Sequence, residues 1–323
     1  SVGGGATQTA DGPPPARGVA CADSGHRLVT FGGYSGSYSR LLSTFDAETL
    51  TWSRLMPSGR APKPRQGATL TSFSSYLILY GGSDDVTPFG DVHLLRDVSA
   101  DSPAAPSWQA PPVHCEPRGD CHEPPPREQH TATVVDRKVW VFGGLGGRGR
   151  ERHALDDLHY LRVSYRRRVR GSDADAGADD GDDGTDVPRL TWHAAADLVQ
   201  TPQFAPRARF GHTAIGMGER LYIFGGYASR AASLSDLHIF DTTSFTWSQP
   251  QPARAFTPEP RAGAAWAVSG RDAYLVGGCS VRADTSAVAR HERCYDDVLV
   301  LKSKYVRRHS AAGSLVPTTS LAG

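Results

Sequence analysis

The most obvious absence from this sequence of 323 residues is a long apolar run. A helix that crosses a membrane needs about 20 consecutive apolar residues, whereas the apolar stretches here are as short as the one from Tyr76 to Tyr80. The first residues, Ser1 to Ala10, also lack the basic start and apolar run of a secretory signal. We therefore expect neither a spanning helix nor a signal peptide in these residues, and the missing initiating methionine suggests a fragment of a longer chain.

An excess of charge of one sign is also absent, because 35 Lys and Arg residues balance 34 Asp and Glu residues to a net charge of +1. Binding of nucleic acid through bulk charge is therefore not expected. Cysteine is scarce, and its count of five is odd. Such a set favours a reducing compartment over a dense disulfide framework. We predict a cytoplasmic protein, with the nucleus as the alternative location, and no insertion into a membrane.

Glycine and proline are abundant, at 35 and 23 residues. Ordinary composition would provide about 12 % of these two residues together, and here they are spread along the chain without the strict period of collagen. A hydrophobic content of 39 % is enough for a sizeable core at this length. Together these features predict a folded chain with many short elements joined by many turns.

The glycines mark an internal repeat, in which a short apolar run ends in Gly-Gly five times. These runs are Arg27 to Gly33, Tyr76 to Gly82, Lys138 to Gly144, Arg220 to Gly226 and Ala273 to Gly278. A turn and a strand of small residues precede each run. A variable loop and an apolar strand follow it, and in four copies that strand begins with an aspartate, namely Asp91, Asp157, Asp236 and Asp297. Four copies close on a strand with a tryptophan, namely Trp52, Trp108, Trp192 and Trp247.

Four short β-rich runs at a period of about 50 residues are typical of a propeller blade. The pattern resembles the Kelch repeat, and the resemblance covers Pro15 to Leu301. It implies an all-β fold, a Kelch-type β-propeller with five recognisable four-stranded blades. We favour a small ring whose last sheet is completed by terminal residues. A sixth, degenerate blade made from both termini and a truncated chain are the alternatives.

The resemblance also sets the expected boundaries. One propeller domain spans residues 15–301, between an N-terminal segment at 1–14 and a C-terminal tail at 302–323. The repeats are expected at about 15–56, 62–110, 124–194, 205–249 and 258–301. An insert at 162–189, first basic and then acidic, has almost no apolar residues, so we predict that it is disordered.

Loops between the second and third strands of each blade share one face of a propeller with the links between blades, because the strands alternate in direction. Long loops on a rigid ring commonly carry function. The start of the first strand on this face carries Arg65, Arg127, Arg209 and Arg261, and the third repeat adds Arg148, Arg150, Arg152 and His153. We predict a basic ring at the channel mouth that binds an acidic peptide or protein through its carboxylates. The alternative is that the arginines are satisfied internally, by aspartates of neighbouring blades or by carbonyl groups.

Two cysteine-containing segments offer further chemistry. Four residues that could bind a metal lie close together, namely His114, Cys115, Cys121 and His122, but five residues separate the two cysteines, where zinc sites usually have two to four. They are weak metal candidates, with a local disulfide or free side chains as alternatives, and we expect no cofactor. Cys279 and Cys294 flank the loop of the fifth repeat on strands expected to be neighbours. A disulfide between them is geometrically allowed, but a reducing compartment would leave two thiols.

Catalytic signatures are missing from the sequence, which contains no phosphate-binding glycine loop, nucleophile elbow or zinc-binding helix. Glu116 and Asp120 match two positions of the iron motif of Kelch specifier proteins, but its third position is Pro124. We therefore expect a protein without enzymatic activity. The Kelch resemblance implies a protein–protein interaction module that serves as a scaffold or substrate-recognition adaptor. The alternatives are a structural subunit of a cytoskeletal or other large assembly and, less favoured, a metal-dependent enzyme.

Overall fold

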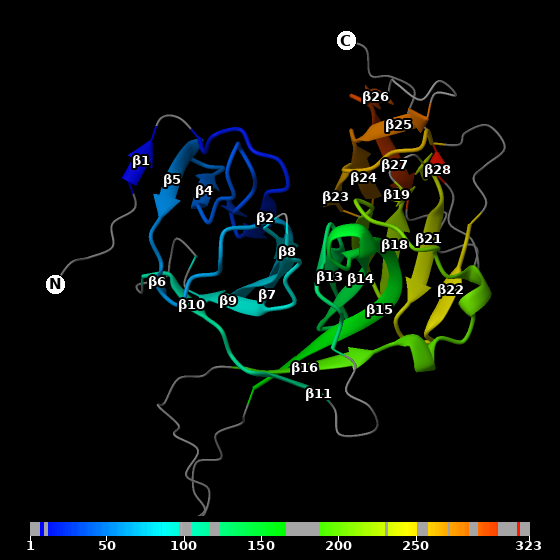
Figure 1. The fold of residues 1–323 in the computed structure, drawn as a ribbon, viewed down its shortest axis with the longest axis horizontal. Coiled ribbons are helices and arrows are strands. Elements are labelled where there is room, and N and C mark those ends of the chain that lie inside the picture. Colours follow the sequence, from blue (N-terminus) through cyan, green and yellow to red (C-terminus); the bar gives the residue numbers. More distant parts are fainter. Residues whose placement is uncertain are drawn as a thin grey trace, which may run out of the picture.

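The computed structural model is built almost entirely of β-strands, which form five blades around a central channel (Figure 1). It describes residues 7–9, 12–84, 86–96, 98, 105–115, 123–165, 188–229, 232–250, 258–270, 272–283, 290–302 and 315–316. Three short 3₁₀ turns are the only helical elements in these ranges, and no helix there could span a membrane. The predicted all-β propeller with five blades is thereby confirmed.

Each blade takes its strands from one repeat, and the strands follow one another from the channel outward. Blade 1 consists of β2 (Ala20–Ser24), β3 (Arg27–Phe31), β4 (Leu42–Asp46) and β5 (Thr51–Leu55). Blade 2 consists of β7 (Gln66–Phe73), β8 (Tyr76–Ser83), β9 (Val92–Arg96) and β10 (Ser107–Gln109). Blade 3 consists of β12 (Arg127–Glu128) and β13 (Thr131–Val135), then β14 (Lys138–Gly146), β15 (His153–Ser164) and β16 (Arg189–Ala194). Blade 4 consists of β17 (Thr213–Met217), β18 (Arg220–Phe224), β21 (Leu237–Asp241) and β22 (Thr246–Ser248).

Blade 5 consists of β23 (Ala265–Ser269), β24 (Asp272–Val276), β27 (Val298–Lys302) and β28 (Leu315–Val316). Its outer strand therefore comes from C-terminal residues, as favoured from the sequence. At the other end of the chain, β1 (Thr7–Thr9) pairs with β5 of blade 1. The alternative of a sixth blade made from both termini is not what the described residues form, because β1 and β28 extend two different blades.

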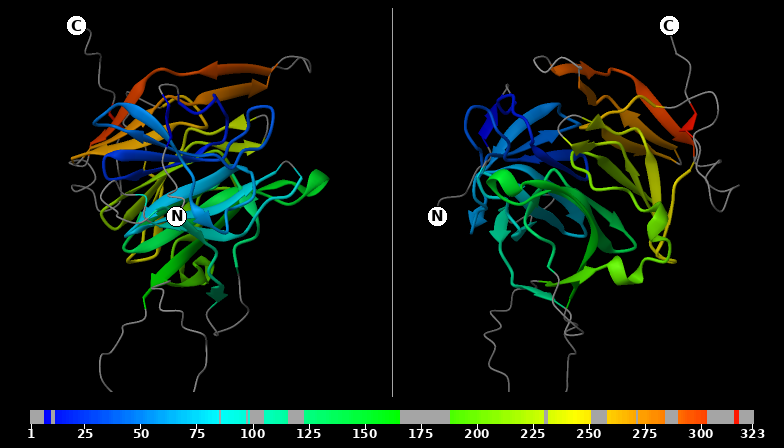
Figure 2. Two further views of the ribbon diagram at one scale, coloured as in Figure 1. Left: turned by 90° about the vertical axis from the view of Figure 1, so that its left-hand side faces the viewer. Right: turned by 45° about the vertical axis from the view of Figure 1, so that its right-hand side comes forward.

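Other short strands extend the sheets beyond four strands. β6 (Ser58–Gly59) and β11 (Val113–Cys115) run parallel to the outer strands of blades 2 and 3. A separate four-stranded sheet joins two hairpins that follow the Gly-Gly pairs of blades 4 and 5 (Figure 2). It contains β19 (Tyr227–Ser229), β20 (Ala232–Ser233), β25 (Cys279–Ala283) and β26 (Arg290–Cys294). Two segments expected as loops are thus paired strands.

The insert of the third repeat begins later than predicted. β15 continues through Ser164, so Arg162 and Val163 belong to a paired strand. The strand persists because β16 provides ladder partners as far as Arg189. Residues 166–187, which include most of the predicted insert, lie outside the described residues.

The apolar core lies in layers between neighbouring blades. Alternate side chains of each strand point to opposite faces of its sheet, so one blade presents apolar residues to the blade on either side. Phe31 of blade 1, for example, packs edge-on against Trp108 of blade 2 at a centroid distance of 5.3 Å. Each buried residue of this kind contributes about 1.5–3 kcal/mol. Because a single blade cannot bury both faces alone, the blades depend on one another for stability.

A ladder of backbone hydrogen bonds links the blades at the channel wall. The N–H of Gly67 donates to the carbonyl oxygen of Gly18 at 2.8 Å, and that of Gln129 to Gly67 at 2.8 Å. Gly211 donates to Gln129 at 2.9 Å, and Gly263 to Gly211 at 2.8 Å. All five residues have φ between +54° and +65°, a conformation that glycine adopts without strain. These ladder residues set the mutual register of the blades.

Two buried histidines add side-chain links between blades. The Nε2 atom of His130 lies 3.0 Å from Thr69 Oγ1, and that of His212 lies 2.9 Å from Thr131 Oγ1. Burial, with a nearby arginine, lowers the pKa of the His212 imidazole to about 3 and that of His130 well below its usual range. Both rings therefore stay neutral in the folded protein at neutral pH.

The lowered histidine pKa values predict a pH-dependent stability. Between pH 6.5, near the ordinary histidine pKa, and about 3, the unfolded chain binds more protons than the folded chain. The free energy of unfolding should therefore fall as pH falls through this window, by up to ~1.4 kcal/mol per pH unit for each histidine. Urea unfolding of wild type and His212→Gln at pH 7.5, 6.0 and 5.0 measures this, and the variant should show a shallower decline. An exposed control, His153→Gln, should decline like wild type, and equal slopes in all three proteins would contradict the assignment.

Candidate functional site

The four arginines predicted to form a basic ring lie inside the blades, with side chains at most 1 % exposed. In blade 3, Arg127 Nη1 and Nη2 donate to the two carboxylate oxygens of Asp157 at 2.7 and 2.5 Å. Nη1 also donates to the carbonyl oxygen of Gly143 at 2.9 Å, and Nε to that of Pro125 at 3.0 Å. The same fork joins Arg65 to Asp91, Arg209 to Asp236 and Arg261 to Asp297.

In blades 2 to 4 the histidine two residues after the aspartate is also hydrogen-bonded to it, as His159 Nε2 is to Asp157 at 3.0 Å. Burial by itself raises the carboxyl pKa. Hydrogen bonds from the histidine and the arginine outweigh burial, and they hold the pKa of Asp91, Asp157 and Asp236 well below the usual range. Each arginine in these blades thus has a permanent counter-ion.

This pairing corrects the prediction that Arg65, Arg127, Arg209 and Arg261 form a basic ring open to a partner. In blade 2, for example, Arg65 immediately precedes β7 and Asp91 immediately precedes β9, so both lie at the same end of one sheet. The counter-ion comes from the same blade. The alternative inferred from the sequence was an aspartate of a neighbouring blade. A partner could bind these buried guanidinium groups only by displacing the carboxylate that pairs with each of them, so we describe the four as framework arginines.

Blade 1 lacks both members of this pair. Ala16 stands two residues before the ladder residue Gly18, as Arg65 stands before Gly67, and Leu41 precedes β4 as Asp91 precedes β9. Loss of one partner alone would leave a buried charge uncompensated. The joint replacement by two apolar residues avoids that cost.

A cavity of about 810 Å³ opens at the channel mouth, inside the ring of ladder residues. Its walls include the residue immediately before each ladder residue, namely Arg17, Gln66, Glu128, Phe210 and Ala262. The framework arginine and the ladder glycine recur in most blades, whereas this position is different in all five. The chemistry of the cavity is therefore set by a single variable position in each repeat.

Arg17 is the exposed cation of this cavity. Its guanidinium carbon lies 4.8 Å from the centre of the Tyr34 ring, a geometry that stabilises a cation over an aromatic face. Two backbone hydrogen bonds with Tyr34, at 3.1 and 2.9 Å, fix the base of the side chain. No ion pair to Arg17 occurs within the described ranges, so its charge is available to a ligand.

Glu128 supplies the opposite charge but is already paired. It is buried, accepts a hydrogen bond from Ser83 Oγ at 2.5 Å, and forms an ion pair with Arg152. Arg152 follows the 3₁₀ turn η1 (Gly149–Glu151) in the long loop between β14 and β15. Of the basic residues predicted in that loop, Arg152 is the one that lines the cavity. Arg148, Arg150 and His153 are exposed and lie outside its lining.

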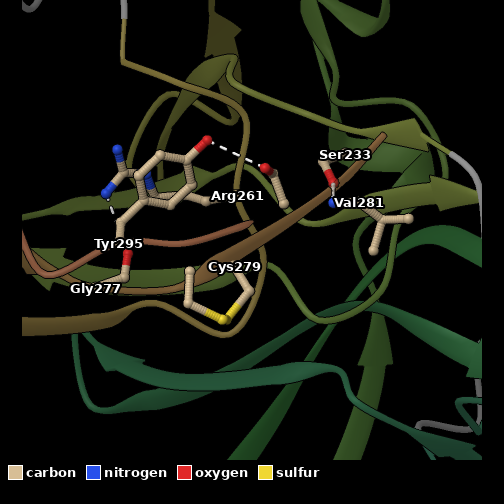
Figure 3. Close-up of a disulfide and its surroundings, with 8 residues drawn as sticks. Ser233, Arg261, Gly277, Cys279, Val281 and Tyr295 are labelled. Carbon is tan, nitrogen blue, oxygen red and sulfur yellow. Dashed lines mark hydrogen bonds between the residues drawn. A yellow bond between two sulfur atoms is a disulfide. The ribbon is translucent and has the colours of Figure 1, made fainter. Parts of the chain in front are cut away.

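The far wall of the cavity is aromatic and apolar. The Phe210 and Tyr227 rings lie 5.5 Å apart between centroids, and Cys279 and Val281 from β25 continue this wall. Figure 3 shows that Cys279 is joined to Cys294 in a disulfide, a pairing that the sequence left open. This bond closes the β25–β26 hairpin beside the cavity.

Tyr295, the residue after Cys294, connects this hairpin to the framework arginine Arg261. The Arg261 guanidinium carbon lies 4.1 Å from the centre of the Tyr295 ring, and the Tyr295 hydroxyl is hydrogen-bonded to Ser280 Oγ at 3.1 Å (Figure 3). The apolar wall of the cavity is therefore held by covalent, aromatic and polar contacts together.

The weak metal candidates are only partly described. His114 and Cys115 lie on β11, which pairs with β16, while Cys121 and His122 lie outside the described residues. Among the residues that the structure does describe, no cluster of three or more His, Cys, Asp or Glu side chains could hold a metal ion. The metal prediction for this segment stays untested.

Sequence reasoning missed most of the cavity wall, including Gln66, Glu128, Phe210 and Tyr227. Arg17 was missed as well, because it lies one residue after the position that the framework arginines occupy in the other repeats. The available signal was the contrast between two adjacent positions in the repeats: the first is arginine in all repeats but one, and the next is different in every copy. The position that is mostly arginine belongs to the framework, and the variable position after it lines the cavity.

The framework pair predicts a large loss of stability when one partner is removed. Arg127→Ala leaves Asp157 without its guanidinium, so the free energy of unfolding should fall by about 3–5 kcal/mol. The double variant Arg127→Ala/Asp157→Leu reproduces the natural Ala16 and Leu41 of blade 1, and it should recover part of that loss. Chemical denaturation of both proteins measures the difference. A single variant as stable as wild type, or a double variant worse than the single one, would refute the framework role.

Comparisons with known proteins agree with this architecture. The model of the KLHDC2/KLHL20/DRC7 Kelch-repeats domain matches residues 18–174 and 180–312. Kelch domain-containing protein 3 of Homo sapiens is 28 % identical over 283 residues, covering 80 % of this chain and 62 % of that protein. Acyl-CoA-binding domain-containing protein 4 of Arabidopsis thaliana is 26 % identical over 227 residues, covering 69 % of this chain and 27 % of that protein. The chain thus spans less than two thirds of the length of either relative.

The solved structure of YjhT is similar in fold, with a TM-score of 0.62 and 15 % sequence identity. The match covers 90 % of this chain and 83 % of that one. The Kelch resemblance read from the Gly-Gly repeats is confirmed, because the matching family model extends over nearly the whole propeller. The chain belongs to the KLHDC2/KLHL20/DRC7 Kelch-repeats domain family.

Proposed function

We propose that this protein is a non-catalytic interaction module that binds an acidic peptide or protein segment in the cavity at the channel mouth. The observation that carries the proposal is Arg17, an exposed cation whose base is fixed on Tyr34 at the rim of a cavity of about 810 Å³. Kelch propellers typically mediate protein–protein interactions, and a cavity of this size accommodates several side chains.

The electrostatics of the cavity favour a carboxylate. Arg152 and Glu128 neutralise each other, and the buried His130 ring is uncharged, which leaves the Arg17 charge without compensation. A guanidinium group pairs bidentately with a carboxylate and contributes direction as well as charge. Phe210 and Tyr227 on the far wall would take an apolar or aromatic side chain next to the acidic group.

The same arrangement suits a scaffold or substrate-recognition subunit of a larger complex. The recognition chemistry lies on one face of the ring, at the variable positions, while the framework arginines and the layers between blades are independent of it. A partner bound at the mouth would leave the outer strands of the blades free for other contacts. We propose a cytoplasmic location because cysteine is scarce. In that reducing compartment the Cys279–Cys294 disulfide would be opened to two thiols.

The proposal predicts that charge reversal at Arg17 weakens acidic-peptide binding. An array of dodecapeptides with one, two or three Glu residues, with and without a free C-terminal carboxylate, is the probe. Loss of a charged hydrogen bond costs about 1.5–3 kcal/mol, so Arg17→Glu should weaken binding of captured peptides at least tenfold in fluorescence anisotropy. Arg54→Glu makes the same change in net charge at an exposed residue of β5 and should bind like wild type. Equal losses in both variants, or none in Arg17→Glu, would overturn the proposal.

A further inference from the structure

Gln129 is the one residue of the backbone ladder that is not a glycine. The other four are Gly18, Gly67, Gly211 and Gly263, and all five have a positive φ, which is +54° at Gln129. A side chain makes this conformation unfavourable because its Cβ crowds the backbone. Gln129 therefore adopts a strained conformation at a position where glycine would be free of strain.

Neither a hairpin turn nor the ladder itself accounts for a side chain at this position. The other non-glycine residues of the described chain with a positive φ lie in tight turns between paired strands, and they are Leu50, Ser74, Asp136, Arg137 and Phe245. Gln129 lies instead between β12 and β13, which both pair with β14. Its ladder bonds use only the backbone N–H and carbonyl groups, which glycine supplies equally well. Because strained residues cluster at functional sites, we looked for a role of the side chain.

The Gln129 side chain lies in the cavity, over the two neighbouring ladder glycines. A Cβ added at Gly67 would lie 3.4 Å from Gln129 Cγ, and one added at Gly211 would lie 3.7 Å from Gln129 Oε1. Gln129 is half-buried and lines the cavity. Its side-chain amide forms no hydrogen bond with any residue that the structure describes. The amide oxygen and the NH₂ group are therefore both available to a ligand.

Gln66 places a second amide beside the first. It begins β7 and lines the same cavity, and its side chain likewise has no hydrogen-bonding partner in the described ranges. A Cβ added at Gly18 would lie 3.1 Å from Gln66 Cβ, so Gln66 lies over the ladder glycine of blade 1. In blade order the wall thus presents the cation of Arg17, the amides of Gln66 and Gln129, and the aromatic ring of Phe210.

Two unpaired amides suit the main chain of a peptide. A primary amide carries a donor and an acceptor, and each residue of an extended peptide offers the same two groups on its main chain. A carboxylate offers acceptors only, and it would leave the amide oxygen unpaired. A segment that places an acidic side chain at Arg17 and an apolar side chain at Phe210 must carry its main chain past the amides between them.

We propose that Gln129, with Gln66 beside it, binds the main chain of an extended acidic peptide at the channel mouth. This inference rests on the proposed function and adds how the bound segment is held. Arg17 and the aromatic wall select among side chains, whereas the two glutamines bind groups that every peptide has. The side chain of Gln129 is thus required for binding, and the fold does not need it.

The substitution Gln129→Gly separates binding from stability. Glycine is the residue that the other ladder positions carry, so the unfolding temperature should stay the same or rise. The probe is the acidic dodecapeptide that wild type captures most tightly from the array. Loss of two hydrogen bonds should weaken its binding about tenfold in fluorescence anisotropy. Binding as tight as that of wild type would overturn the proposal.

Leu50→Gly is the matched control for the change of backbone. Leu50 has a φ of +55° in the turn between β4 and β5, is 72 % exposed and lies outside the cavity lining. The substitution removes the same kind of strain at a distance from the cavity, and this variant should bind the peptide like wild type. Equal weakening in Leu50→Gly and Gln129→Gly would contradict a contact made by the Gln129 side chain.

Methylated peptides identify the group that Gln129 contacts. In a set of copies of the same dodecapeptide, each backbone N–H in turn is replaced by N-methyl. One such methylation should weaken binding to wild type about tenfold and should have little effect on Gln129→Gly, because that variant has already lost the hydrogen bond. If every methylation weakens binding to both proteins by the same factor, Gln129 does not bind the main chain and the proposal is wrong.

The outcomes also separate this inference from the proposed function. If no acidic dodecapeptide binds wild type, or if Arg17→Glu binds as tightly as wild type, the proposed function is wrong and the inference falls with it. If Arg17→Glu weakens binding and Gln129→Gly does not, the proposed function stands and only the role of Gln129 is refuted.

Discussion

The hydrogen-bonded ion pair between a buried arginine and an aspartate of the same blade is the interaction on which the rest of the structure depends. In blade 3, Arg127 connects β12 to β15 through Asp157 and to β14 through the Gly143 carbonyl. The carbonyl of the next such arginine, Arg209, in turn accepts from Gly144. One side chain and its backbone thus fix both the inside of a blade and its junction with the neighbour.

This framework separates stability from recognition. Because the arginine is fully used inside the blade, the next residue of the strand is left to face the channel, and it can change without disturbing the sheet. Arg17, Glu128 and Phe210 occupy that position in three blades and give the cavity a cation, a paired anion and an aromatic wall. The repeats can therefore share one framework while each contributes a different side chain to the cavity wall.

The sequence predicted the fold well because Gly-Gly pairs, strand-initial aspartates and tryptophans are local signals that recur at fixed spacing. The prediction for the framework arginines was wrong. An arginine at the start of a strand looks the same in the sequence whether its side chain faces the channel or pairs with an aspartate far along the chain, such as Asp91. The β19–β20 and β25–β26 hairpins were missed since they pair across two blades. Arg17 was missed because blade 1 lacks the arginine that would have aligned it.

The central claim is that the framework arginines are internal while Arg17 is available to a ligand. The most direct measurement is modification of the native protein with phenylglyoxal, followed over time by mass spectrometry of each arginine-containing peptide. Arg17, Arg148 and Arg150 should react first, and Arg65, Arg127, Arg209 and Arg261 should stay unmodified until the chain unfolds. Modification of these four in the native protein, at the rate of Arg148, would contradict the account.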